Sequence, residues 1–171
     1  MKYSRFEELP VWRAAIELAV QTYALTANAC FKGQASLRDQ IERAAVSVSN
    51  NIAEGFERGT TQELLTFLYI ARGSAGEVRS MLCLLEHLPA FCNLKSEISN
   101  LKSKAESISR QLRAWSDSMQ NSGIKGQRYL TDKTRRADQS AREREEFLKE
   151  LRQIQNENIS KARPQGEPVD S

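Results

Sequence analysis

The chain has 171 residues, of which 40% are hydrophobic and only 7% aromatic, and its formal net charge is +3. This size suits one domain plus an appendage, and so few aromatic residues favour helices packed through aliphatic side chains. The sequence contains no stretch of about 18 uncharged apolar residues and no basic-then-apolar leader, so we expect neither a membrane span nor a secretory signal, and a cytoplasmic location. The three cysteines lack metal-ligand spacing and indicate reduced thiols.

Positive and negative charges nearly balance in both parts of the chain. Residues 1–120 carry 14 Lys and Arg against 13 Asp and Glu, and residues 121–171 carry 11 against 9. Such a balance permits binding to nucleic acid but does not require it.

The first helix is predicted from Pro10 to about Cys30. Proline suits a first helical turn, and apolar residues recur after it at steps of three and four. Gly33 is expected to end this helix. Ser36 is the expected N-cap of the second helix, with the carboxylate of Asp39 three residues later.

The second predicted helix, residues 37–58, carries two adjacent stripes. Its apolar stripe consists of Leu37, Ile41, Ala44, Ala45, Val48, Ile52 and Phe56. Its polar stripe consists of Gln40, Arg43, Ser47, Asn51 and Glu54. The polar stripe is either an exposed flank or a hydrogen-bonded chain covered by a neighbouring helix. In the second interpretation Arg43 bonds towards Ser47. Asn51 bonds in the same way towards Glu54.

A third helix is predicted over about residues 62–87, with Thr60 or Thr61 as its cap. Gly73 and Gly76 lie in its middle, where each costs about 1 kcal/mol relative to Ala. We interpret both glycines as sites of close helix packing, because small residues let another backbone approach. A phosphate-binding loop is the alternative interpretation, but the segment lacks the preceding strand and the following Lys-Ser/Thr of such loops.

The fourth predicted helix follows a link at residues 89–93 and has a seam of heptad type. The seam consists of Leu94, Ile98, Leu101, Ala105, Ile108, Leu112, Trp115 and Met119. Four long helices joined by short links predict an all-α fold, an up-down-up-down antiparallel four-helix bundle over residues 1–120.

Residues 121–171 are predicted to form a charged C-terminal extension. A fifth helix is expected over about residues 135–159, charged nearly all round and marginal without a partner. The end of the chain is expected to be disordered.

Catalytic and metal-binding patterns are missing from the sequence. His87 is the single histidine and has no second ligand at suitable spacing, and the Glu-x-x-His motifs of di-iron bundles are absent. We therefore predict no metal, no cofactor and no enzymatic activity.

Three segments carry a resemblance to a known family. LPVWRAAIELAVQTY, LRDQIERAAVSVSNNIAEGFERGT and FLYIARGSAGEV resemble, in order and spacing, the bacterial four-helix-bundle proteins first noticed as products of intervening sequences in large-subunit ribosomal RNA genes. The likeness covers about residues 6–119, and its most specific part is residues 51–55 followed about twenty residues later by residues 71–77. The fold is similar to that of the accessory variability proteins of diversity-generating retroelements, which are homopentamers that bind a reverse transcriptase and RNA through a basic surface.

This resemblance implies a homo-oligomer, a pentamer, without catalytic activity of its own. It also implies that the polar stripe, together with Ser74 and Glu77, forms a network that holds helices or subunits together. Ser49 departs from the family, which usually has proline there, so the kink that proline would bring is not inherited. The extension after Asn121 lies outside the likeness.

Three functions are compatible with these features. The first is a nucleic-acid-binding accessory protein, RNA being the expected ligand, in which oligomerisation multiplies a modest basic patch. Its candidate contacts are Arg5, Arg13, Lys102, Lys104, Arg110 and Arg113 in the bundle and Lys125, Arg128, Arg135 and Arg136 in the extension. The second is a protein-interaction scaffold that docks a partner through the fifth helix. The third is a small enzyme whose site is assembled between subunits. We adopt the first, and expect Arg110 and Arg113 to contact the RNA backbone.

Overall fold

The computed structural model describes residues 3–121, 140 and 143–153. Within these residues the structure is helical and has no strand, which confirms the predicted all-α fold. The chain divides into two compact units, Met1–Arg128 and Tyr129–Ser171, and each is described by itself.

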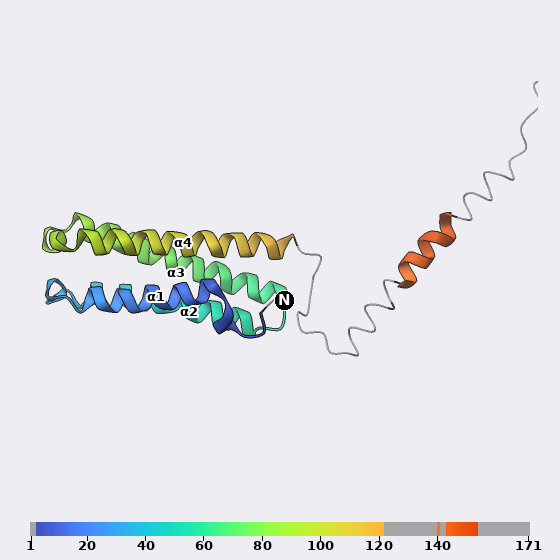
Figure 1. The fold of residues 1–171 in the computed structure, drawn as a ribbon, viewed down its shortest axis with the longest axis horizontal. Coiled ribbons are helices and arrows are strands. Elements are labelled where there is room, and N and C mark those ends of the chain that lie inside the picture. Colours follow the sequence, from blue (N-terminus) through green and yellow to red (C-terminus); the bar gives the residue numbers. More distant parts are fainter. Residues whose placement is uncertain (1–2, 122–139, 141–142, 154–171) are drawn as a thin grey trace, which may run out of the picture. The chain divides into compact units, whose positions relative to one another are not determined.

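The first unit consists of four long helices (Figure 1). They are α1 (Pro10–Thr26), α2 (Ala35–Glu57), α3 (Thr61–His87) and α4 (Lys95–Gln120). Three short 3-10 turns precede or join them: η1 (Phe6–Glu8), η2 (Ala29–Phe31) and η3 (Pro89–Leu94). Helix α1 thus ends four residues before the predicted boundary, because the chain turns through η2 before Gly33.

Contacts between neighbouring helices show their antiparallel order. Helix α3 packs on both α2 and α4, and α1 closes the bundle by packing on the same two helices. Tyr69 near the start of α3 contacts Gln120 at the end of α4. Glu86 near the end of α3 contacts Lys102 near the start of α4. The arrangement is the up-down-up-down bundle expected from the short links.

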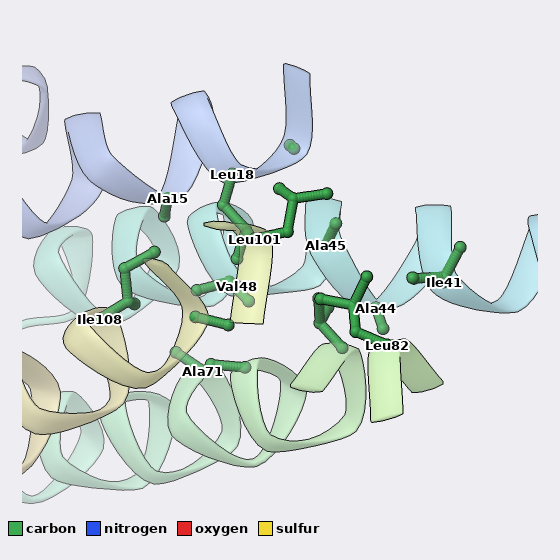
Figure 2. Close-up of a cluster of buried hydrophobic side chains, with 14 of the residues drawn as sticks. Ala15, Leu18, Ile41, Ala44, Ala45, Val48, Ala71, Leu82, Leu101 and Ile108 are labelled. Carbon is green, nitrogen blue, oxygen red and sulfur yellow. The ribbon is translucent and has the colours of Figure 1, made fainter. Parts of the chain in front are cut away.

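Buried aliphatic side chains fill the centre of the bundle (Figure 2). Leu18, Ile41, Leu82 and Ile108 come from four different helices and are fully buried. Small residues alternate with them on every helix: Ala15, Ala44, Ala45, Ala71, Ala75 and Ala105 are all buried. Such alternation lets helix backbones come close while larger side chains fill the space between them.

The helix ends follow one of the three predicted signals. The prediction for Gly33 is wrong, because α1 ends at Thr26 with Ala27 as its C-cap, and Gly33 lies beyond η2 with a φ of +82°, a conformation that glycine adopts without a steric penalty. Thr60 caps α3 as predicted, because its hydroxyl accepts a hydrogen bond from the backbone N–H of Glu63 at 3.2 Å. The prediction for Ser36 is wrong, since α2 begins at Ala35 and its cap residue makes no side-chain hydrogen bond.

Residues 143–153 of the second unit are helical, which falls within the predicted fifth helix. Phe147, Leu148 and Leu151 lie on one side of this helix with exposed fractions of 60%, 43% and 40%. Glu145 and Lys149 form an ion pair one turn apart at 3.4 Å. The remainder of the predicted helix, and the predicted disordered end, lie outside the described residues.

Candidate functional site

Polar side chains of α2 and α3 meet at the edge of the core. The hydroxyl oxygens of Ser47 and Ser74 are 3.0 Å apart. The side-chain amide of Asn51 donates to the carbonyl and to the hydroxyl of Ser47, at 2.7 and 2.9 Å. Ser74 can also donate to the carbonyl of Ile70 at 3.1 Å. These partly buried groups satisfy one another across the two helices.

The remaining members of the polar stripe do not extend this cluster into one chain. Gln40 lies nearer the start of α2, and its side-chain amide donates to the carboxylate of Glu77 on α3 at 3.3 Å. Glu54 forms an ion pair with Arg58 at 2.5 Å, so Asn51 does not bond towards it as the sequence suggested. Arg43 is exposed and bonds neither to Ser47 nor to any other described residue.

The two glycines predicted to mark close packing lie in open space within this chain. A Cβ at Gly73 or Gly76 would have no heavy atom within 4 Å. Close packing inside the bundle occurs at Gly55 instead, where a Cβ would lie 2.7 Å from the Cβ of Phe67. Among the described residues nothing fills this space, so Gly73 and Gly76 leave room for close approach by something outside the described bundle.

The outer face of α3 combines these glycines with exposed apolar side chains. Tyr69, Ile70 and Leu84 have exposed fractions of 44%, 46% and 49%. We define the outer face by five uncharged residues on one side of the helix, Tyr69, Gly73, Gly76, Ser80 and Leu84; Ile70 lies beside it, beyond Glu77. In a chain with 27% charged residues, an exposed helix face without a charge is typical of an interface.

Helix α1 has a second exposed apolar face. Ile16, Val20 and Tyr23, spaced four and three residues apart, have exposed fractions of 36%, 62% and 49%. Because α1 and α3 each pack on α2 and on α4, they occupy opposite corners of the bundle. The two apolar faces are therefore separate surfaces.

Five of the six bundle cations predicted to bind nucleic acid are paired with carboxylates of the chain itself. The pairs in the bundle are Arg5–Glu7 at 2.7 Å, Lys102–Glu86 at 2.6 Å, Lys104–Glu17 at 2.8 Å, Arg110–Glu106 at 3.4 Å and Arg113–Asp117 at 3.7 Å. Arg13 donates to the backbone carbonyl of Glu7 at 2.7 Å. The predicted contacts in the extension, Lys125, Arg128, Arg135 and Arg136, lie outside the described residues.

Ion pairing shifts the pKa of several of these groups. The hydrogen bond to Glu86 raises the pKa of Lys102 above its ordinary value. The hydrogen bond from Lys104 lowers the pKa of Glu17. Within the pair near the amino terminus, the pKa of Arg5 is raised and that of Glu7 is lowered by their mutual hydrogen bond. All four groups remain charged at neutral pH.

Five other cations of residues 3–121 have side chains that form no ion pair or hydrogen bond with another described residue: Lys32, Arg43, Arg72, Arg79 and Lys95. None of these was singled out from the sequence for binding nucleic acid. The sequence alone could not separate paired from unpaired cations, because Lys102 and Lys104 find their carboxylates on other helices.

No group of three potential metal ligands occurs among the described residues. The Nδ1 atom of His87 lies 2.8 Å from the carbonyl oxygen of Cys83, one turn back in α3, and this contact fixes the ring at the helix end. None of the described helices combines the length and the apolar character that crossing a membrane requires.

Two comparisons place the chain among known proteins. Residues 7–114 match the model of the family described as 23S rRNA-intervening sequence protein. A solved structure from Bacteroides thetaiotaomicron, described as a protein of unknown function from the S23 ribosomal protein family, matches with a TM-score of 0.55 and 20% identity. That match covers 61% of this chain and 96% of the other, and at this identity it shows the fold alone. The search among curated proteins gives no match. Since the family model spans more than half of the sequence, the chain belongs to the 23S rRNA-intervening sequence protein family.

Proposed function

We propose that the protein is a homo-oligomeric RNA-binding accessory protein without catalytic chemistry of its own. The observation that carries the proposal is membership of a family named for an insertion in 23S rRNA, over residues 7–114. The name of this family is what favours RNA over DNA as the ligand.

The exposed apolar faces of α1 and α3 support self-association. The face of α3 centres on Gly73, where open space lets another helix come close, and the face of α1 offers Val20 and Tyr23 as side chains that would be buried. Because these faces are different and lie on opposite corners of the bundle, contact between them is head-to-tail. Repeated head-to-tail contact closes into a ring when the rotation permits, which is compatible with a pentamer.

Oligomerisation would compensate for the low charge of a single copy. One chain has a net charge of +3, and much of the positive charge of its bundle is already neutralised by ion pairs. Several copies in one ring would present their unpaired cations together. RNA bound across them would release more counterions, and its affinity would fall steeply with salt.

Two measurements on the full-length protein test this proposal. Light scattering at high salt gives the solution mass, and titration with a labelled RNA hairpin and with duplex DNA at several salt concentrations gives affinities and salt slopes. We expect an oligomer that binds the RNA with a steep slope. A monomer, or an oligomer that ignores both nucleic acids at low salt, would overturn the proposal.

A second candidate function rests on the helix at residues 143–153. Its exposed Phe147, Leu148 and Leu151 are what an amphipathic helix uses to dock on a protein groove. In that case the extension recruits a protein, and RNA binding is incidental. A reverse transcriptase is the partner that the resemblance implies. Replacing Phe147 and Leu151 by Ser should abolish recruitment of that protein while leaving RNA affinity unchanged, whereas the accessory-protein proposal by itself predicts no such loss.

A further inference from the structure

Arg72 and Arg79 are two of the five unpaired cations among residues 3–121, and they share one side of α3. Neither forms an ion pair or a hydrogen bond within the described residues. They are seven residues apart on α3, so they lie on the same side of the helix and about 10.5 Å apart along its axis. Arg72 is half-buried and Arg79 is exposed, so that both guanidinium groups belong to one accessible strip.

Two contacts show that this strip lies along the edge where α3 and α4 meet, called the α3–α4 edge below. Glu86, seven residues beyond Arg79, accepts a hydrogen bond from Lys102 of α4 at 2.6 Å. Before Arg72, the hydroxyl of Tyr69 accepts a hydrogen bond from the side-chain amide of Gln120 on α4 at 2.5 Å. Both arginines lie between these two points along the edge where the helices meet.

Arg113 adds a third cation beside the two arginines. It lies on α4 between Lys102 and Gln120, and its ion pair with Asp117 is long, at 3.7 Å, and solvent-exposed. Such surface pairs are weak and exchange readily with other ligands. Arg113 can therefore exchange Asp117 for a phosphate bound at Arg72 and Arg79.

We infer that this α3–α4 edge binds the phosphate backbone of RNA, with Arg72 and Arg79 as the contacting residues. The inference rests on the proposed RNA-binding function and specifies its surface. Both residues are arginines, whose planar guanidinium groups pair with phosphate oxygens in a bidentate manner.

Unpaired arginines also suit this role better than Arg110, which the sequence analysis favoured. Arg110 already binds Glu106, so a phosphate would have to replace that carboxylate and leave it without a partner. Arg72 and Arg79 lose no partner within the described residues when they bind a phosphate. Each therefore contributes the whole of its counterion release to binding.

The test compares two double variants of the full-length protein that remove the same amount of charge. In R72Q/R79Q the α3–α4 edge loses both contacts, and in the matched control R38Q/R110Q two ion-paired arginines that the proposal does not use are lost, one on α2 and one on α4. The probe is a labelled RNA hairpin with a single-stranded loop, titrated at several salt concentrations. We expect R72Q/R79Q to weaken binding at least tenfold and to lower the salt slope by about 1.5, and the control to weaken binding less than threefold.

Each outcome decides a separate point. If the wild-type protein binds the hairpin and R72Q/R79Q has the same affinity as the control variant, Arg72 and Arg79 do not contact the RNA, while the proposed function stands. If the wild-type protein ignores the hairpin but binds an acidic protein, both are wrong. Solution mass and circular dichroism must match the wild type for each variant. Should R72Q/R79Q fail to fold, the exposed single variant R79Q serves in its place, with an expected loss of about 1 in the salt slope.

Discussion

Gly55 is the residue at which α2 and α3 have no room for a side chain. A Cβ there would lie 2.7 Å from the Cβ of Phe67 and 3.3 Å from a methyl group of Leu64. The Cβ of Phe67 is fixed to the backbone of α3, so relief requires movement of a helix. The sequence draws attention to Gly73 and Gly76, because they interrupt a helical period, whereas Gly55 lies near the end of the second predicted helix and does not stand out. Only the pairing of α2 with α3 reveals which glycine is sterically required.

Replacement of Gly55 by Ala should therefore destabilise the bundle. We expect a loss of about 1–3 kcal/mol in the free energy of unfolding, the usual cost of overpacking. The matched control is Gly59→Ala, where a Cβ meets no atom within 4 Å and the change should stay within about 0.5 kcal/mol. Denaturant unfolding followed by circular dichroism measures both. Equal effects in the two variants would show that α2 and α3 separate at Gly55 without cost.

The ion pair between Lys102 and Glu86 makes a pH-dependent contribution to stability. The pKa of Lys102 is raised in the folded protein, so the stabilisation is fully present below the ordinary lysine pKa and is lost as the pH rises through the raised value. We expect the difference in thermal midpoint between the wild type and Lys102→Met to be constant from pH 7 to about pH 10 and to shrink above it. A difference that stays constant through pH 12 would contradict this assignment.

At the scale of elements, the pairing of α2 with α3 explains the polar stripe. Periodicity correctly places Ser47 and Asn51 at the edge of the apolar face, where they contact each other. It cannot give their partners across the helices, since those depend on the relative shift of α2 and α3 along the bundle. Asn51 reaches back one turn to Ser47, whose carbonyl and hydroxyl both accept hydrogen bonds from its side-chain amide.

A double-mutant cycle measures how strongly this cluster couples the two helices. Ser47→Ala, Ser74→Ala and the double variant are compared by denaturant unfolding. We expect each single substitution to cost about 0.5–1.5 kcal/mol and the pair to show a coupling energy of about 0.5 kcal/mol or more. Ser80→Ala, on the outer face of α3, is the control and should have little effect. Additive losses would mean that the 3.0 Å contact between the hydroxyls adds no stability.

At the scale of the whole molecule, the fold was predictable and the distribution of charge was not. Four helical periods separated by short links leave few alternatives to an antiparallel bundle. The cations on α4 looked available in the sequence, yet Lys102 and Lys104 bind carboxylates of α3 and α1. Such pairs depend on distances between helices, about which the spacing of residues along one helix carries no information.

The outer face of α3 allows assembly to be separated from folding. Gly73→Leu adds a bulky side chain where the chain itself leaves open space, so the bundle should keep its helix content. If Gly73 lies against another copy, the same side chain prevents close approach and the solution mass falls to that of a monomer. Light scattering and circular dichroism measure the two effects. Ser103→Leu, on the exposed side of α4, is the matched control and should leave the mass unchanged.

An oligomer that persists in Gly73→Leu would place the contact between copies elsewhere. The exposed face of α1 is then the next surface to alter, by Val20→Glu. If either variant loses both its helix content and its oligomeric solution mass, folding and assembly are one process.

The two ends of the bundle are unlike, and this difference bears on how the protein can be tagged. Tyr3 and Leu9 line the same apolar groove as Trp115 and Met119, so the start of the chain and the end of α4 share one end. Phe31 and Phe91 pack edge to face at the other, where the links between helices are short. A fluorescent protein fused ahead of Tyr3 would lie beside the end of α4. The same fluorescent protein inserted at the Gly33 turn would lie at the other end of the bundle and leave the end of α4 uncovered, so the label would suit imaging of the full-length protein.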